Sequence, residues 1–453
     1  MSFEKEGAKK LVKDLKEAKI ELISMKLIID KKDDHIYPIP PPFNTPDHYE
    51  WLFLSDASII QEGPGIRKYQ YAESGIQFLT VTNITEGSID FKKSQKYIDF
   101  AEYEKKYKHF TLNNGDIVTA CSGASWGKSA VFESDSLMML NTSTLRLRFF
   151  KDLGENKYLY YLTKSNYFKA NLASHSTGQQ ANYGYSHYSK IPIPIPSTEE
   201  QKEIVEILDQ AFESIEKAKA NIEKNIENAK ELFQSKLNKV FSQSKGWEHK
   251  TIGDICNLMT GGTPSRKEKE YFENGTINWL VSGDINKKTI NDCEGKITEK
   301  GLNNSNAKFL PINSVMIALN GQGKTRGSVA KLKIKATCNQ SLVSINPIDD
   351  NQILSDYIYS NLNSRYIEIR KMTGDSGNDR RGLNMPLIRS IKISFPKSIE
   401  KQKEIIEVIE ILDNHIQSLL TSYDEELKNL KELKKSILQK AFSGELTNKS
   451  FAA

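Results

Sequence analysis

The feature that most restricts the fold of this chain is an internal repeat at a shift of about 200 residues. Near its start Gly63 aligns with Gly261, and near its end Gln201 to Ile204 aligns with Gln402 to Ile405. Further matches are Ile76, Phe78, Leu79 and Ile84 with Ile277, Trp279, Leu280 and Ile285, and Asn141-Thr142-Ser143 with Asn339-Gln340-Ser341. A repeating unit this long is a duplicated domain followed by a helix, and not a solenoid repeat.

Each repeat opens with a stretch in which short β-branched and aromatic runs alternate with Gly, Asn and Ser. This punctuation predicts a mixed domain with many short strands. We therefore expect an α+β fold, in which two mixed α/β domains, related by an internal pseudo-twofold repeat, are separated by two long helices that form an antiparallel coiled coil. The expected parts are an N-terminal helix and Pro-rich linker (1–46), a first domain (47–196), a first long helix (197–243), a second domain (244–396), a second long helix (397–446) and a tail (447–453).

The long helices are predicted from their apolar spacing. Residues Thr198 to Phe241 contain no Pro or Gly, and their apolar positions step by 4-3-4-3-4-4-3, which is a coiled-coil seam with one stutter. The stretch from about Ser398 to Phe442 carries the same steps 201 residues later. The seam positions are Ile204, Leu208, Ala211, Ile215, Ala218, Ile222, Ile226 and Ala229, then Ile405, Ile409, Leu412, Ile416, Leu419, Tyr423, Leu427 and Leu430. We expect the helices to pack on each other, since each alone would expose its seam. The alternative is two unrelated amphipathic helices, each covering its own domain.

The first 30 residues also look helical, with Leu11, Leu15, Ile20 and Leu27 among many Lys and Glu. One place where this helix could pack is beside the two long helices. Prolines from Pro38 to Pro46 then indicate a stiff linker.

Composition permits nucleic-acid binding without requiring it, since 63 Lys and Arg face 58 Asp and Glu. The four cysteines form no CxxC pair, so we expect packed, reduced thiols and neither a zinc site nor a disulfide framework. No apolar run is long enough to cross a bilayer, and the charged start does not resemble a signal peptide, so a cytoplasmic protein is expected.

No catalytic constellation is found. The segment Gly321 to Thr325 resembles the end of a phosphate-binding P-loop, but Ala318 stands where the first glycine is required, and Ser122 fails in the same way in the first repeat. Both segments run on into apolar stretches instead of a helix. Pro40 to Phe43 lacks the acid or amide that an adenine methyltransferase motif needs, and the seven histidines show no metal-ligand spacing. We therefore expect no catalytic residue, no metal and no cofactor in this chain.

Basic, amide-rich and aromatic loops remain, and they suit nucleic acid. Gln and Asn can pair with adenine, and Arg with guanine, through two hydrogen bonds each. For each residue the alternative is a solvated surface position or a contact to phosphate alone. The candidate DNA-binding residues are Arg67, Lys68, Lys92, Lys93, Lys128, Gln179, Gln180, Asn182 and Tyr183 in the first repeat, and Arg266, Lys267, Lys324, Arg326, Asn378, Arg380 and Arg381 in the second.

With these features the chain resembles the specificity subunits of type I restriction-modification systems over nearly its full length. The residues that carry the resemblance are Thr260 to Arg266, Tyr271-Phe272, Gly275, Ile277, Trp279-Leu280 and Gly283-Asp284-Ile285 for the start of a target recognition domain, and Ile193 to Pro196 with Glu200 to Ile204, then Phe395-Pro396 with Lys401 to Ile405, for the strand-to-helix junction. The first domain departs more, with Gly63 to Arg67 in place of Gly261 to Arg266. Lys401 replaces Glu200 at the second junction, a difference that we expect to matter little.

The resemblance implies a non-catalytic protein with two target recognition domains, each reading one part of a bipartite, asymmetric site in double-stranded DNA. It also implies two methyltransferase subunits that hold S-adenosylmethionine and methylate adenine at N6, and motor-nuclease subunits that use ATP and Mg. Two alternatives stay open: a specificity module of another restriction system or a methylation-only system, and a stand-alone nuclease.

Overall fold

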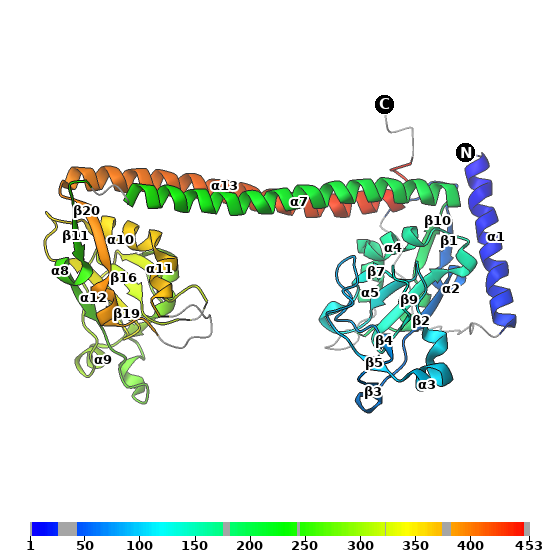
Figure 1. Cartoon of the computed structure of the whole chain (residues 1–453), viewed down its shortest axis with the longest axis horizontal. Coiled ribbons are helices and arrows are strands. Elements are labelled where there is room, and N and C mark those ends of the chain that lie inside the picture. Colours follow the sequence, from blue (N-terminus) through cyan, green and yellow to red (C-terminus); the bar gives the residue numbers. More distant parts are fainter. Residues whose placement is uncertain are drawn as a thin grey trace. The chain divides into compact units, whose positions relative to one another are not determined.

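The structure is a computed structural model that describes residues 2–25, 43–174, 182–241, 245–321, 323–373 and 382–447 (Figure 1). The chain divides into two compact units. The first unit comprises Met1–Asn221 and Glu426–Ala453, and the second comprises Ile222–Glu425. Each unit therefore contains one copy of the repeated domain together with a part of each long helix.

In the first unit, β1 (Glu50–Phe53) pairs antiparallel with β10 (Pro192–Ile195) next to the start of the first long helix (Figure 1). The central sheet is fully antiparallel, and along β9 the side chains alternate, with Leu145 and Leu147 buried and Arg146 and Arg148 half-buried on the other face. Its order is β2 (Ser58–Glu62), β9 (Thr144–Phe149), β6 (Ile117–Ala120) and β7 (Ser129–Val131). A smaller sheet has the order β3 (Tyr71–Ala72), β5 (Tyr97–Ile98), β4 (Ile76–Phe78) and β8 (Met138–Met139), with β4 and β8 parallel.

The helices of this domain are short. They are α2 (Leu54–Ala57), α3 (Phe100–Glu102), α4 (Asn156–Lys164), α5 (Asn166–Ala173) and α6 (Tyr185–Ser189), the 3-10 turns η1 (Lys68–Gln70), η3 (Lys108–Phe110), η4 (Gly123–Ser125) and η5 (Phe150–Asp152), and the π-helical turn η2 (Tyr103–Tyr107).

The second unit repeats this plan, which confirms the duplication. β11 (Trp247–Thr251) pairs antiparallel with β20 (Lys392–Pro396). The central sheet has the order β12 (Cys256–Thr260), β19 (Leu342–Pro347), β16 (Val315–Ala318), β17 (Val329–Leu332) and β14 (Thr289–Ile290), and the smaller sheet β15 (Lys296–Ile297), β13 (Ile277–Leu280) and β18 (Thr337–Cys338). The remaining elements are α8 (Ile252–Ile255), α9 (Glu299–Asn303), α10 (Ser355–Ser364), α11 (Tyr366–Lys371), α12 (Met385–Ser390), η6 (Lys269–Tyr271) and η7 (Ser282–Lys287).

The long helices are α7 (Thr198–Phe241) and α13 (Ile399–Phe442), each of 44 residues. In the first unit, the beginning of α7 shares a core with the end of α13, and Glu216 pairs with Lys434 at 3.1 Å. In the second unit, the beginning of α13 shares a core with the end of α7, through Ile405 and Leu237 among others. The helices are therefore antiparallel and pack on each other as expected, and the alternative, in which each covers only its own domain, is wrong.

The predicted seam of α7 is buried or half-buried at every position. In α13 one position differs: Leu419 is 40% exposed, whereas Leu420 is half-buried. With Leu420 in place of Leu419 the second seam steps by 4-3-4-4-3-4-3. The second seam therefore also contains one stutter, but the stutter lies earlier than in the first seam.

The N-terminal helix α1 (Ser2–Ser24) packs on the first domain against α2, β1 and η5, and not along the long helices. Leu11, Leu15 and Leu22 are buried in this contact, and Lys19 pairs with Asp56 at 2.8 Å. The expected Pro-rich linker lies outside the described residues up to position 42.

A buried glutamine fixes the start of each long helix. Gln201 accepts a hydrogen bond from the backbone N of Glu155 at 2.9 Å and donates to the carbonyl oxygen of Pro196 at 3.1 Å. Gln402 does the same with Leu354 and Pro396, both at 2.9 Å. This role explains why the junction motif repeats in the sequence.

The residue before that glutamine corrects an expectation, because the exchange of Glu200 for Lys401 matters. Glu200 is buried and accepts hydrogen bonds from Tyr49 and His48 at 2.9 Å and from Thr447 at 2.6 Å. Burial, followed by the charge of nearby groups such as Glu200, raises the pKa of Tyr49 well above its usual range. Lys401 instead forms an exposed pair with Glu404. The Glu200 carboxylate, near the start of α7, thus joins the segment just before β1 to Thr447, the last described residue.

Candidate nucleic-acid interface

Four loops meet at one end of the central sheet in each unit, and we call each group a loop cluster. In the first unit they are 63–69, 121–128, 141–143 and 174–183, of which 175–181 lie outside the described residues. Cys121 accepts from the backbone N of Tyr183 and donates to Ser143, both at 2.8 Å, and Thr142 Oγ1 donates to the carbonyl oxygen of Pro64 at 2.9 Å. These contacts bring together three of the stretches that carry predicted DNA contacts, those that begin at Gly63, at Cys121 and at Asn182.

The second unit has the corresponding cluster of loops 261–268, 319–328, 339–341 and 373–384, of which 322 and 374–381 lie outside the described residues. Leu319 accepts from Leu383 N at 2.9 Å and donates to Ser341 at 2.8 Å. Thr263 Oγ1 donates to Gln340 Oε1 at 2.7 Å.

The aligned glycines allow the loops of each cluster to pack closely against each other. A Cβ atom on Gly63 would lie 2.1 Å from the Asn141 carbonyl oxygen, and one on Gly261 would lie 1.8 Å from that of Cys338. Real Cβ atoms do not approach backbone this closely. Glycine at both positions is therefore a packing requirement of the cluster.

The two P-loop look-alike segments each connect two antiparallel strands. Gly321 to Thr325 lies between β16 and β17, which are antiparallel neighbours, and its counterpart lies between β6 and β7. Gly323 (φ +61°) and Gly327 (φ +82°) adopt the left-handed conformation that such turns need. No long helix follows either turn, so the segments lack the helix N-terminus that holds phosphate, as predicted.

The candidate residues fall into three groups. The exposed ones are Arg67, Lys68, Lys92, Lys93, Asn182, Arg266, Lys267 and Lys324, while Lys128 is half-buried. Asn182 forms a β-bridge with Ser122 inside the first cluster. Lys92 and Lys93 lie on a separate turn, where the Asp90 carboxylate accepts from the Lys92 backbone N at 3.0 Å.

Two candidates are corrected by their burial. Tyr183 is 2% exposed and packs against Trp126 with ring centroids 5.1 Å apart, so its side chain belongs to the core of the first domain. Arg326 is 7% exposed beneath the β16–β17 turn. Neither presents its side chain to a ligand. Gln179, Gln180, Asn378, Arg380 and Arg381 lie outside the described residues.

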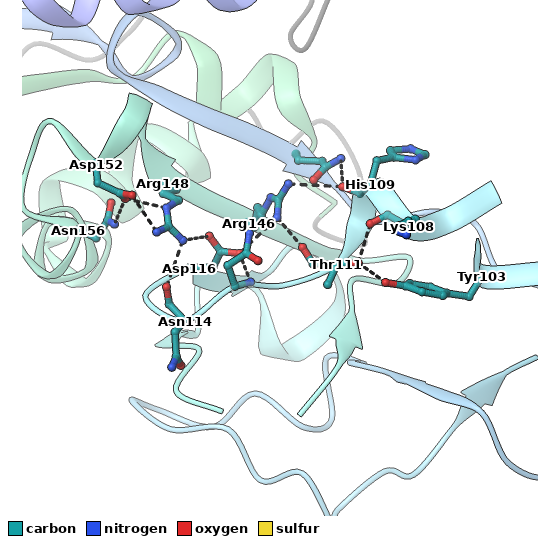
Figure 2. A network of polar contacts seen from close by, with 12 residues as sticks. Tyr103, Lys108, His109, Thr111, Asn114, Asp116, Arg146, Arg148, Asp152 and Asn156 are labelled. Carbon is teal, nitrogen blue, oxygen red and sulfur yellow. Dashed lines mark hydrogen bonds and ion pairs between the residues drawn. The ribbon is translucent and has the colours of Figure 1, made fainter. Parts of the chain in front are cut away.

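Figure 2 shows a polar network that fastens the segment before β6 to β9. The fully buried carboxylate of Asp116 accepts from Arg146 Nη1 at 3.3 Å and from Arg148 Nη1 at 3.1 Å. Arg146 Nη1 also donates to the Thr111 carbonyl oxygen at 2.7 Å, and Arg148 Nε donates to Asp152 at 2.7 Å. These two arginines are held by protein groups and support the domain internally.

The network shifts the pKa values of Arg148 and Asp152. Hydrogen bonding to Asp152 is the main cause that raises the pKa of Arg148, and the same bond lowers the pKa of Asp152. In the second domain the positions aligned with Asp116, Arg146 and Arg148 are Ser314, Ser344 and Asn346. Each domain therefore has its own central sheet of the same kind, but different side chains stabilise the two sheets.

Some residues outside the loops also contact or border the clusters, and the sequence does not point to them. In the second unit Tyr366 OH donates to the Lys324 carbonyl oxygen at 3.0 Å, and Arg370 Nη1 donates to Tyr366 OH at 2.9 Å. In the first unit the missed residue is Tyr69, whose side chain is 87% exposed. An unusual exposure of this kind has no sequence signal.

All four cysteines are buried and free, as expected, and burial raises the pKa of Cys121, Cys256 and Cys338 to about 12. Among the described residues no group of three His, Cys, Asp or Glu side chains is placed to hold a metal ion. Within the same residues no helix is both long and apolar enough to cross a membrane.

A family model described as the type I restriction modification DNA specificity domain matches residues 46–228 and 244–429. The chain belongs to this family. Its two domains are thus DNA specificity domains, and the resemblance inferred from the sequence motifs is confirmed.

Three relatives are type I restriction enzyme specificity subunits. That of EcoR124I/EcoR124II from Escherichia coli is 29% identical over 60% of this chain and 67% of its own length. The StySPI subunit from Salmonella potsdam is 25% identical over 64% and 65%. The MjaIX subunit from Methanocaldococcus jannaschii is 24% identical over 65% and 70%.

Two solved structures share the fold. A chain from a study of complex assembly and conformational transition of the type I R-M system superposes with a TM-score of 0.71 and 17% identity, over 89% of this chain and 100% of that chain. The HsdS subunit from Thermoanaerobacter tengcongensis gives 0.55 and 18%, over 89% and 98%.

Proposed function

We propose that this specificity subunit reads a bipartite, asymmetric DNA site, one half with each loop cluster. The observation that carries the proposal is that one scaffold occurs twice with different exposed side chains on corresponding loops. Thr142 stands where the second unit has Gln340, and Gly65 to Arg67 replaces Thr263 to Arg266. A shared scaffold with different loops is suited to two different half-sites.

The long helices would act as the spacer between the half-sites and as the docking surface for methyltransferase subunits. A helix of 44 residues is about 66 Å long at 1.5 Å per residue. B-DNA rises 3.4 Å per base pair, so the half-sites would lie at most about 19 base pairs apart.

Chemistry would come from partner subunits. Two methyltransferase subunits would supply S-adenosylmethionine and methylate adenine at N6, and motor-nuclease subunits would supply ATP- and Mg-dependent translocation and cleavage. This assignment is supported by the names of the relatives as subunits of type I restriction enzymes. We place the protein in the cytoplasm, where host DNA is accessible.

The test is to express the chain with the methyltransferase encoded beside it in a host free of adenine methylation, and to map N6-methyladenine by single-molecule sequencing. We expect one bipartite motif that disappears when this chain is omitted. Methylation that persists unchanged without the chain would contradict the proposal. Metal-dependent cleavage by the purified chain alone would favour a nuclease.

The genes beside this one separate a complete restriction system from a methylation-only system, because only the former includes a motor-nuclease gene. A specificity module of another restriction enzyme is the second candidate, and it predicts the same motif with different neighbouring genes.

A further inference from the structure

The turn η1 in the first unit presents an aromatic ring to solvent on a rigid support. Tyr69, its middle residue, is 87% exposed, while the residues on both sides of the turn are anchored. Ile66 is buried in the cluster that lines the smaller sheet, and Tyr71 packs on Phe78 with ring centroids 5.3 Å apart. The exposed ring is therefore not at the end of a loosely attached loop.

Gln70 locks the turn from within. Its Oε1 accepts from the backbone N of Arg67 at 2.9 Å, and its Nε2 donates to Glu102 Oε1 at 2.8 Å and to Tyr107 OH at 3.0 Å. These bonds join the turn to α3 and η2. A preorganised side chain loses little conformational freedom when it binds a ligand.

The charges beside the ring favour a polyanion. Arg67 and Lys68 are exposed, and no acidic side chain of the described residues pairs with either one. Two exposed cations that directly precede an exposed ring in the sequence combine phosphate attraction with a flat apolar surface, a pairing typical of nucleic-acid contacts.

The second repeat keeps the turn and changes this surface. By position in the turn, Lys68, Tyr69 and Gln70 of η1 correspond to Lys269, Glu270 and Tyr271 of η6. Glu270 pairs with Lys300 at 2.5 Å. The turn is thus retained as scaffold, while a paired carboxylate replaces the exposed ring of Tyr69.

We infer that Tyr69 contacts base edges in the half-site read by the first domain, with Arg67 and Lys68 on the adjacent phosphates and Gln70 as the positioning residue. This inference rests on the proposed function. The apolar face of the Tyr69 ring would contact an apolar group on a base edge, such as a thymine methyl group. Loss of the ring would relax preference at its base pair by about tenfold.

The experiment uses the full chain and a pool of random-sequence duplexes, with sequencing of the bound fraction. We expect Tyr69→Ala to relax one position of the first half-site, Tyr69→Phe to retain it, and the second half-site to stay unchanged. Ile20→Ala, which trims an exposed apolar residue on α1, is the matched control and should bind as the native chain does.

Salt dependence separates the cations from the ring. Arg67→Ala and Lys68→Ala should each reduce the slope of log affinity against log salt by about 0.9 without altering sequence preference. Lys9→Ala, another exposed lysine, should leave the slope unchanged. Tyr69→Ala should also leave it unchanged.

A double-mutant cycle tests the positioning role. Gln70→Leu should relax the same base position as Tyr69→Ala, and the double variant should lose no more than either single variant. Additive losses would assign Gln70 a separate structural role.

The possible failures are distinguishable. If the native chain enriches no bipartite sequence, the proposed function itself fails. If it does enrich one and Tyr69→Ala enriches the same motif equally well, only this inference is overturned. If Tyr69→Ala keeps its DNA preference but no longer assembles with the methyltransferase, the ring belongs to a protein interface and the inference is equally overturned.

Discussion

Replacing the buried carboxylate in Figure 2 should destabilise the first domain measurably. In Asp116→Asn the side chain keeps its size but loses its charge, leaving Arg146 and Arg148 with less compensation. Breaking a buried ion pair costs about 3 to 5 kcal/mol. Here Arg148 keeps Asp152, and Arg146 keeps the Thr111 carbonyl oxygen, so we expect a loss of about 2 to 3 kcal/mol in the free energy of unfolding.

The matched control is Ser314→Ala at the aligned position of the second domain. Ser314 is equally buried, but its hydroxyl donates one neutral hydrogen bond to the Pro311 carbonyl oxygen at 2.8 Å. Its loss should cost about 1 kcal/mol. Urea unfolding followed by hydrogen exchange, resolved by peptide, assigns each loss to its domain. A loss below about 1 kcal/mol for Asp116→Asn would refute the reasoning that the network is a stabilising ion cluster.

Four further outcomes are expected. Gly261→Ala should destabilise the second loop cluster by more than about 2 kcal/mol because its Cβ would meet the Cys338 carbonyl oxygen, whereas Gly283→Ala, with open space around it, should be nearly neutral in thermal unfolding. The pKa of Asp152 is lower in the folded than in the unfolded state. The ionised carboxylate therefore stabilises the folded state above the unfolded-state pKa, and this stabilisation is lost as pH falls through the folded-state pKa. The difference in melting temperature between the native chain and Asp152→Asn should vanish in acid. Iodoacetamide at neutral pH should alkylate Cys121, Cys256 and Cys338 only after unfolding, as mass spectrometry would show, and rapid labelling of the native chain would contradict their burial. Inserting one heptad after Ala229 and one after Leu430 adds about 10 Å to each helix, so the methylated spacer should lengthen by up to about three base pairs; an active variant with the original spacer would show that the helices do not set it.

The repeat and the helical seams could be predicted because both are periodic signals that report burial directly. Gly63 and Gly261 were recognisable as paired, although only the structure shows the carbonyl groups that they admit. Burial periodicity also has a limit, since the side chains of Leu419 and Leu420 are equally apolar and only the packing chooses between them.

Individual site residues were less predictable, because residue type does not determine orientation. The ring and hydroxyl of Tyr183 favour a base contact on sequence grounds, yet its backbone N donates to Cys121 and its side chain lies in the core. The sequence gives no reason to expect a role for Glu200, because its partners, His48, Tyr49 and Thr447, are distant in sequence. Tyr69 carries no sequence signal, because its exposure depends on a turn that Gln70 holds in place.

The core of the first unit includes Leu438, Ala441 and Phe442, and the Phe442 ring lies 5.4 Å from that of Tyr158. The domain encoded first is therefore completed last during synthesis. All residues of the second unit, which ends at Glu425, leave the ribosome before the final turns of α13 do. Until then the nascent first domain exposes the apolar surface that Phe442 will cover, and a message truncated shortly after Glu425 would yield an intact second unit beside a first one that cannot close.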